Sequence, residues 1–169
     1  VEFSGIGGKF YFFKVNYINT LYVPLYKQGT LKGRCDFRFL FPFGQTSKEE
    51  IPFSEKLFMG GETTVRGYKP FIIGPRMDNN KPLGGISSGL FSLELSHAVF
   101  RLMDVFVFAD AGSVSAERLS ISKIRYSVGV GTRIEVMSRV PITVGYGYPI
   151  NPKQKEDRQG IFFSMGGQF

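Results

Sequence analysis

Apolar and polar residues alternate with a period of two along seven segments of this chain, and this pattern limits the possible folds more than any other feature. Residues 31–43 show it well, since apolar side chains recur at every second position while Lys32, Arg34, Asp36 and Arg38 fill positions between them. Successive side chains of a β-strand point to opposite faces, so each segment predicts a strand with one apolar and one polar face. The expected strands lie near residues 13–25, 31–43, 91–96, 105–111, 124–136, 142–148 and 160–169.

The composition favours β-strands over helices. The 169 residues include 18 Phe, 8 Tyr and 21 Gly but no run of 18 apolar residues, which excludes a transmembrane helix. A closed β-barrel is the other structure that can span a bilayer. We therefore predict an all-β fold, an antiparallel transmembrane β-barrel. A soluble β-sandwich is the alternative, because alternation alone does not say whether the apolar face meets lipid or a second sheet.

The expected connections differ in length between the two ends of the strands. Short turns are expected near residues 26–29, 98–103 and 138–141. Residues 44–85 form a long connection, and residues 113–123 and 151–158 form connections of medium length. Short turns at one end and longer loops at the other are typical of outer-membrane barrels.

Few residues in the sequence support catalysis or metal binding. The Gly85–Gly89 segment matches a nucleophile elbow, but a strand is expected after it rather than a helix, and the single histidine, His97, precedes Asp110. One histidine and one cysteine, Cys35, do not provide the usual zinc ligands. We expect no enzymatic activity, no cofactor and no metal.

The net charge of +7 is interpreted as a solvated excess of Lys and Arg. An acidic partner such as nucleic acid or anionic lipid is the other interpretation of this charge. In the first two expected strands, the aromatic and basic residues lie on opposite faces. Bases could not stack there beside phosphate contacts, so we expect no nucleic-acid partner.

One cation, Arg66, lies in the glycine- and proline-rich stretch Met59–Pro75. Glu94 and Asp110 lie on the polar faces of two strands that a short turn joins, and both could lie at a similar depth. If the long loop folds onto that face, the Arg66 guanidinium can bond both carboxylates. If the loop stays outside, Arg66 is solvated, and residue spacing does not decide between the two.

The stretch Phe58–Tyr68, with Val65-Arg66-Gly67-Tyr68 at its end, resembles the sixth extracellular loop of the BamA-type barrel-assembly (bacterial surface antigen) family. The resemblance continues at residues 73–75, 92–95, 108–114 and 124–131 and ends on the aromatic Phe169. It implies a sixteen-stranded outer-membrane barrel of which residues 1–169 are the last seven strands. The earlier strands and the periplasmic POTRA domains would be missing, and the start at Val1, with no initiator Met, fits a mature or excised piece.

The resemblance also implies roles for individual residues. Arg66 would reach into the barrel with Val65, Gly67 and Tyr68 and pair with Glu94 and Asp110. Tyr68 stands where the family more often has Phe. The last strand would form one side of a lateral gate and a C-terminal assembly signal, carried by Phe163, Gly166, Gly167 and Phe169.

The implied function is folding and inserting β-barrel proteins in the bacterial outer membrane. The implied partners are unfolded barrel proteins, accessory lipoproteins of the assembly complex and outer-membrane lipid. The first alternative is a polypeptide transporter of the two-partner-secretion or translocation-module type within the same family. A passive porin-like channel and a soluble ligand-binding barrel are more distant alternatives.

Overall fold

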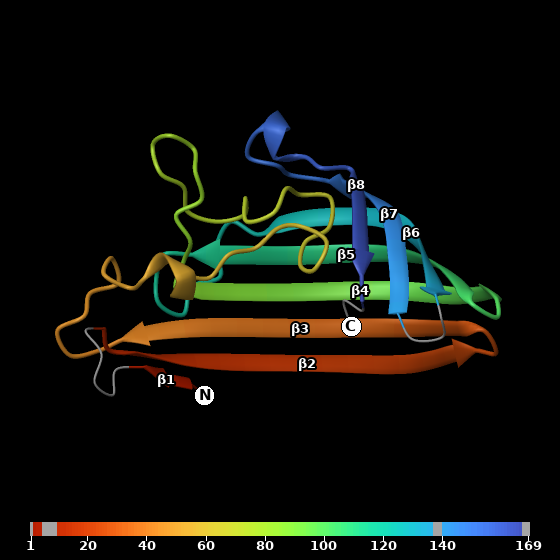
Figure 1. Ribbon diagram of the computed structural model, residues 1–169, viewed down its shortest axis with the longest axis horizontal. Helices are drawn as coiled ribbons and strands as arrows, with labels where there is room; N and C mark the ends of the chain where they lie inside the picture. The colour runs from red at the N-terminus through yellow and green to blue at the C-terminus, as the bar shows by residue number, and fades with distance from the viewer. Residues whose placement is uncertain (1, 5–9, 137–139, 167–169) are drawn as a thin grey trace.

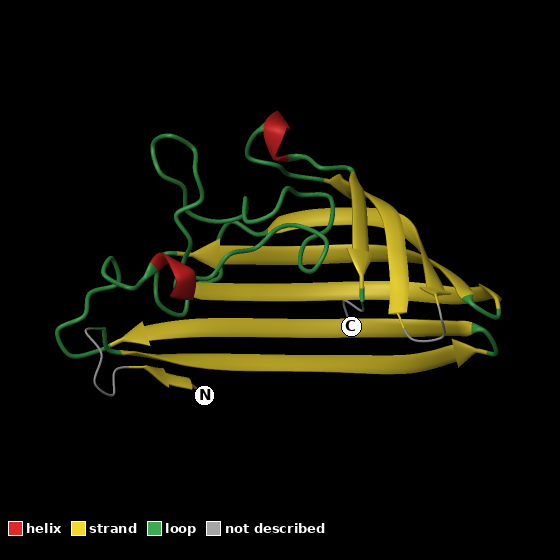
Figure 2. Ribbon diagram, viewed as in Figure 1, coloured by secondary structure: helices red, strands yellow, loops and turns green. Residues whose placement is uncertain are grey.

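The computed structural model describes residues 2–4, 10–136 and 140–166. They form one antiparallel sheet in which each strand pairs with its neighbours in sequence, in the order β1 to β8 (Figure 1). The strands are β1 (Glu2–Ser4), β2 (Phe12–Tyr26), β3 (Gly29–Pro42), β4 (Ser87–Phe100), β5 (Met103–Ser115), β6 (Arg125–Val136), β7 (Val140–Pro149) and β8 (Ile161–Met165). Two short 3-10 helices, η1 (Phe53–Glu55) and η2 (Lys155–Asp157), lie in loops (Figure 2). No helix in the described ranges is long and apolar enough to cross a membrane.

The predicted all-β antiparallel fold is confirmed, since each of the seven alternating segments forms a strand. The structure adds β1, whose three residues are too few to show alternation in the sequence. The last strand is expected over residues 160–169; β8 covers Ile161–Met165, and residues 167–169 lie outside the described ranges. Gly166 follows with φ +100°, a backbone conformation that no longer continues a strand.

The two ends of the sheet differ as the connection lengths predicted. Two-residue turns join β2 to β3 and β4 to β5 at one end (Figure 1). The long segment 43–86 and the segments 116–124 and 150–160 lie at the opposite end. We call residues 43–86 the long loop.

The two faces of the sheet also follow the alternation. The face that carries Ser92, Glu94 and Asp110, here called the inner face, is buried at those residues. On the opposite, outer face, the side chains of Leu93, Val107 and Val130 are at least 50% exposed. Outward apolar side chains along the strands are what a lipid-facing surface requires, because lipid tails replace the missing protein core.

The long loop packs on the inner face of the sheet and supplies seven of the eleven residues of the larger buried cluster. The larger cluster of buried apolar residues joins loop and strand residues: Phe12, Leu40, Ile51, Leu57, Met59, Val65, Tyr68, Ile73, Ile86, Leu90 and Val114. A smaller cluster contains Phe106, Phe108 and Phe162. In Figure 1 the yellow middle part of the loop runs across the sheet within its curve, whereas its yellow-green part projects away from the strands.

Candidate functional site

The long loop touches the sheet backbone to backbone where Gly67 meets Gly147 of β7. Gly67 has φ +89°, in the region that side chains disfavour. A Cβ built on Gly67 would lie 2.8 Å from the Gly147 carbonyl carbon, and one built on Gly147 would lie 2.8 Å from the Gly67 nitrogen. Two glycines therefore let the loop backbone lie directly on the strand backbone, which holds the neighbouring Arg66 over the inner face.

Arg66 binds Asp110 of β5 through its side chain and its main chain. Its Nε and Nη2 donate to Oδ2 and Oδ1 of Asp110 over 2.9 and 2.8 Å, and its backbone N–H donates to Oδ2 over 3.0 Å. Two parallel side-chain hydrogen bonds of this kind form the bidentate geometry typical of a guanidinium facing a carboxylate. The Ser92 hydroxyl, which lies opposite Asp110 in the β4–β5 pairing, donates to Asp110 and accepts from Arg66 Nη2.

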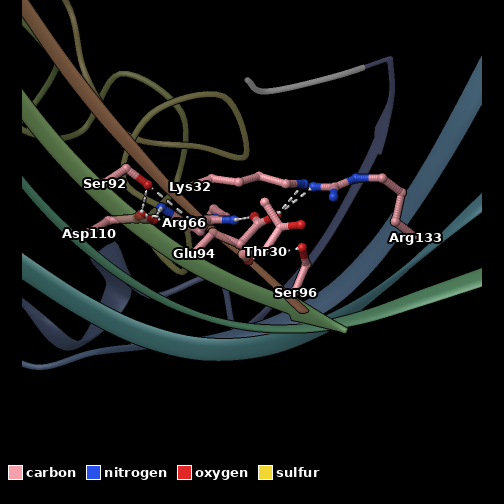
Figure 3. A network of polar contacts seen from close by, with 8 residues as sticks. All are labelled: Thr30, Lys32, Arg66, Ser92, Glu94, Ser96, Asp110 and Arg133. Carbon is pink, nitrogen blue, oxygen red and sulfur yellow. Dashed lines mark hydrogen bonds and ion pairs between the residues drawn. The ribbon is translucent and has the colours of Figure 1, made fainter. Parts of the chain in front are cut away.

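Glu94 of β4 receives three cations. Arg66 Nη1 donates to its Oε2 over 2.8 Å, while Arg133 Nη2 and Lys32 Nζ donate to its Oε1 over 2.9 and 3.2 Å (Figure 3). The side chains of Arg66, Glu94 and Asp110 are at most 1% exposed. Each oxygen of the two carboxylates thus accepts a hydrogen bond from a cation. Such pairing offsets the desolvation free energy that burying the charges costs.

Aromatic rings complete the surroundings of the Arg66 guanidinium. Its central carbon lies 3.6 Å from the centroid of the Phe108 ring, close enough for a cation–π contact. Phe106 lies between two cations, at 5.8 Å from Arg66 and 5.0 Å from Arg133. Room for the Phe108 ring comes from Gly129, its partner on β6, where a Cβ would lie 2.5 Å from the ring.

Val65 and Tyr68 fix the two sides of Arg66. Val65 is fully buried against Gly112 of β5, where a Cβ would lie 2.5 Å from the valine methyl carbon. The Tyr68 hydroxyl reaches Tyr126 O at 3.2 Å and Asn151 Oδ1 at 3.3 Å. Burial raises the pKa of this hydroxyl above its usual value of about 10.

The structure brings six of the sequence-predicted residues together, namely Val65, Arg66, Gly67, Tyr68, Glu94 and Asp110. Four further residues belong to this site without being among the predicted site residues: Lys32, Ser92, Phe108 and Arg133. All four have inner-face parity, so strand register combined with alternation was the available signal. Phe163 and Gly166 lie at the far edge of the sheet instead, and Gly167 and Phe169 lie outside the described residues.

The site is suited to holding a loop rather than to bond chemistry. It contains two carboxylates, three cations and a serine hydroxyl, all engaged with one another. Among the described residues, no group of three or more His, Cys, Asp and Glu side chains could hold a metal ion.

Comparisons with known proteins agree with this architecture. A model of the Omp85 superfamily domain matches residues 1–169. The outer membrane protein assembly factor BamA of Neisseria meningitidis serogroup B is 25% identical over an alignment 198 residues long, and the match covers 96% of this chain and 24% of that protein. The chain therefore spans about a quarter of the length of this curated relative.

Among solved structures, the chain resembles the crystal structure of BamA from Haemophilus ducreyi lacking POTRA domains 1–3. The TM-score is 0.79, and the match covers 95% of this chain and 36% of that chain. The two sequences are 21% identical, so this likeness concerns the fold.

Proposed function

Because its full length matches the Omp85 model, this chain belongs to the Omp85 superfamily, and from that premise we propose that it is the C-terminal part of a barrel that assembles other outer-membrane barrels. The protein is an outer-membrane protein. Its clients would be unfolded β-barrel proteins, and its partners would be accessory lipoproteins of an assembly complex and the surrounding lipid. The proposed barrel has sixteen strands, of which residues 1–169 would supply the last seven long ones.

The observation that carries the proposal is the long loop held on the inner face by Arg66, Glu94 and Asp110. A loop held inside a barrel fills the interior. This arrangement fits a protein that acts through the strands of its barrel better than one that conducts through an open pore. A passive channel would instead need a wet, continuous passage. The similarity to a named assembly factor over 96% of this chain supports the same function.

The proposed mechanism is mechanical and uses the edge of β8. Backbone N–H and C=O groups that lack partners in lipid cost several kcal/mol each, so an unpaired edge favours any strand that can pair with it. Among the described residues, five residues of β8 pair with β7, against ten in the pairing of β6 with β7. We propose that β8 opens laterally from the first strand of the barrel and offers its free edge to a client strand.

Replacing Arg66 in the complete protein tests this function. We expect Arg66→Ala to lower the amount of folded client barrels in cells that depend on this protein, and to lower the yield of folded client in proteoliposomes. Folded and unfolded clients can be separated by their heat-modifiable mobility. Lys153→Ala, an exposed cation of the 150–160 loop, is the control and should leave client folding unchanged.

Two other results would point elsewhere. Normal client folding together with a retained secreted polypeptide would favour a secretion transporter of the same superfamily. A steady ion conductance that is the same with Arg66 and with Ala at this position would favour a porin-like channel and contradict the proposal.

A further inference from the structure

A second buried ion pair joins the long loop to the segment that precedes β8. Nη1 and Nη2 of Arg76 donate to Oδ1 and Oδ2 of Asp157 over 3.0 and 2.6 Å, which is again a bidentate contact. The Arg76 and Asp157 side chains are 5% and 3% exposed. This pair lies outside the Arg66 site and shares no residue with it.

Both partners are held in place by their own backbone surroundings. Nη2 and Nε of Arg76 also donate to Ile72 O, over 2.9 and 3.3 Å. Oδ2 of Asp157 accepts the Gln154 N–H over 3.1 Å, at the start of η2. Each side chain of the ion pair is therefore also hydrogen-bonded to the backbone of its own segment.

Main-chain hydrogen bonds attach the same segment to the loop and to β7. The Lys69 N–H donates to Asp157 O and the Gln159 N–H donates to Gly67 O, both over 2.9 Å. One residue further on, the Gly147 N–H donates to Gly160 O over 2.7 Å. Residues 157–160 thus lie between the loop and β7, and β8 begins directly after them at Ile161.

Within the described residues, β8 has a short pairing with β7, which a hydrogen bond from the Gly166 N–H to Pro141 O extends by one residue. Its five residues pair with residues 142–146 of β7, whereas β6 and β7 pair over ten residues. Its buried aromatic, Phe162, meets the Phe108 ring edge-on with centroids 5.6 Å apart. Because Phe108 also lies under Arg66, this contact connects β8 to the long loop as well.

We propose that Arg76 and Asp157 are positioning residues that fasten the start of β8 to the long loop, so that the loop and this strand shift as one unit. The contact fixes where β8 leaves the loop region and therefore how firmly it pairs with β7. Its consequence for clients rests on the proposed function, because a shift of the loop would then change the edge that β8 offers to an incoming strand.

Hydrogen–deuterium exchange on the complete protein in nanodiscs tests the fastening directly. We expect Arg76→Gln and Asp157→Asn each to speed amide exchange in β8 by about tenfold or more, because a buried pair holds the strand's start. The double variant should exchange no faster than the more affected single variant, since both changes remove one contact. Exchange in β4 and β5 should stay as in the unmodified protein.

Glu55→Gln is the matched control, because it breaks the ion pair of Glu55 with Lys14 that attaches the same loop to β2. It should leave β8 exchange unchanged. Arg76→Lys keeps the charge without the bidentate contact and should give an intermediate rate, which keeps the test informative if a neutral variant fails to fold.

The proposal is overturned if β8 exchanges normally in both single variants, if their effects add, or if all strands speed up together. Failure of the proposed function would look different. In that case the unmodified protein would not fold clients in proteoliposomes, whatever the exchange rates of β8.

Discussion

Gly67 of the long loop and Gly147 of β7 touch backbone to backbone, and neither position has room for a Cβ. The atom would lie 2.8 Å from the partner's main chain in both cases. This contact brings the backbone of Arg66 close enough to Asp110 for its N–H, as well as its guanidinium, to bond the carboxylate. The position of the loop thus depends on glycine at both positions as much as on the charges of Arg66 and Asp110.

Gly147→Ala should push the loop off β7 and destabilise the protein by about 1–3 kcal/mol, the usual cost of overpacking. The loss can be measured as a lower unfolding midpoint in denaturant. Gly33→Ala on β3 is the control, because its Cβ would make an ordinary 3.6 Å contact with Leu93. Equal midpoints for the two variants would contradict the close contact.

Arg66→Ala should destabilise the protein by about 3–5 kcal/mol, because it leaves two buried carboxylates without their shared cation. Arg66→Lys should recover only part of this loss, since an ammonium cannot bond Asp110 with two parallel donors while reaching Glu94. Limited proteolysis of the long loop would measure the effect, with faster cleavage in Ala than in Lys. A lysine variant as resistant as the unmodified protein would show that charge alone holds the loop.

Phe108→Leu removes the ring below Arg66 and the edge-on contact with Phe162. We expect a loss of about 1–2 kcal/mol, from the cation–π contact and the aromatic pair together. Phe100→Leu, at an outer-face ring that is 68% exposed, should change little. A double-mutant cycle with Arg66→Lys would measure the coupling, and additive losses would argue against a cation–π contribution.

Tyr68→Phe should cost about 1 kcal/mol or less, the usual value of a single hydrogen bond. Its effect should depend on pH. Since burial raises the Tyr68 pKa in the folded state, the unfolded chain loses this proton first, and the neutral hydroxyl's contribution is complete below about pH 10 and falls above it. Unfolding midpoints measured from pH 8 to pH 11 should therefore fall less steeply for Tyr68→Phe than for the unmodified protein. Parallel curves would contradict this.

The alternation of apolar and polar residues predicted which face of the sheet each side chain occupies, because the side chains of a strand point to alternate faces. It gave the outer-face position of Leu93 and Val107 and the inner-face position of Glu94 and Asp110. Alternation did not identify Ser92 as a hydrogen-bond partner of Arg66, because only the β4–β5 register places Ser92 opposite Asp110. It also gave no sign of the Arg76–Asp157 pair, whose residues are 81 positions apart.

The amino-acid sequence by itself determined the strands, their two faces and the lengths of their connections, since these depend on local periodicity and on turn residues. It left open whether the long loop folds onto the inner face or stays outside. Only the tertiary structure decided that question, because the answer depends on contacts between distant segments. Gly67 must meet Gly147, Arg66 must reach two strands at once, and the start of β8 must lie between the loop and β7.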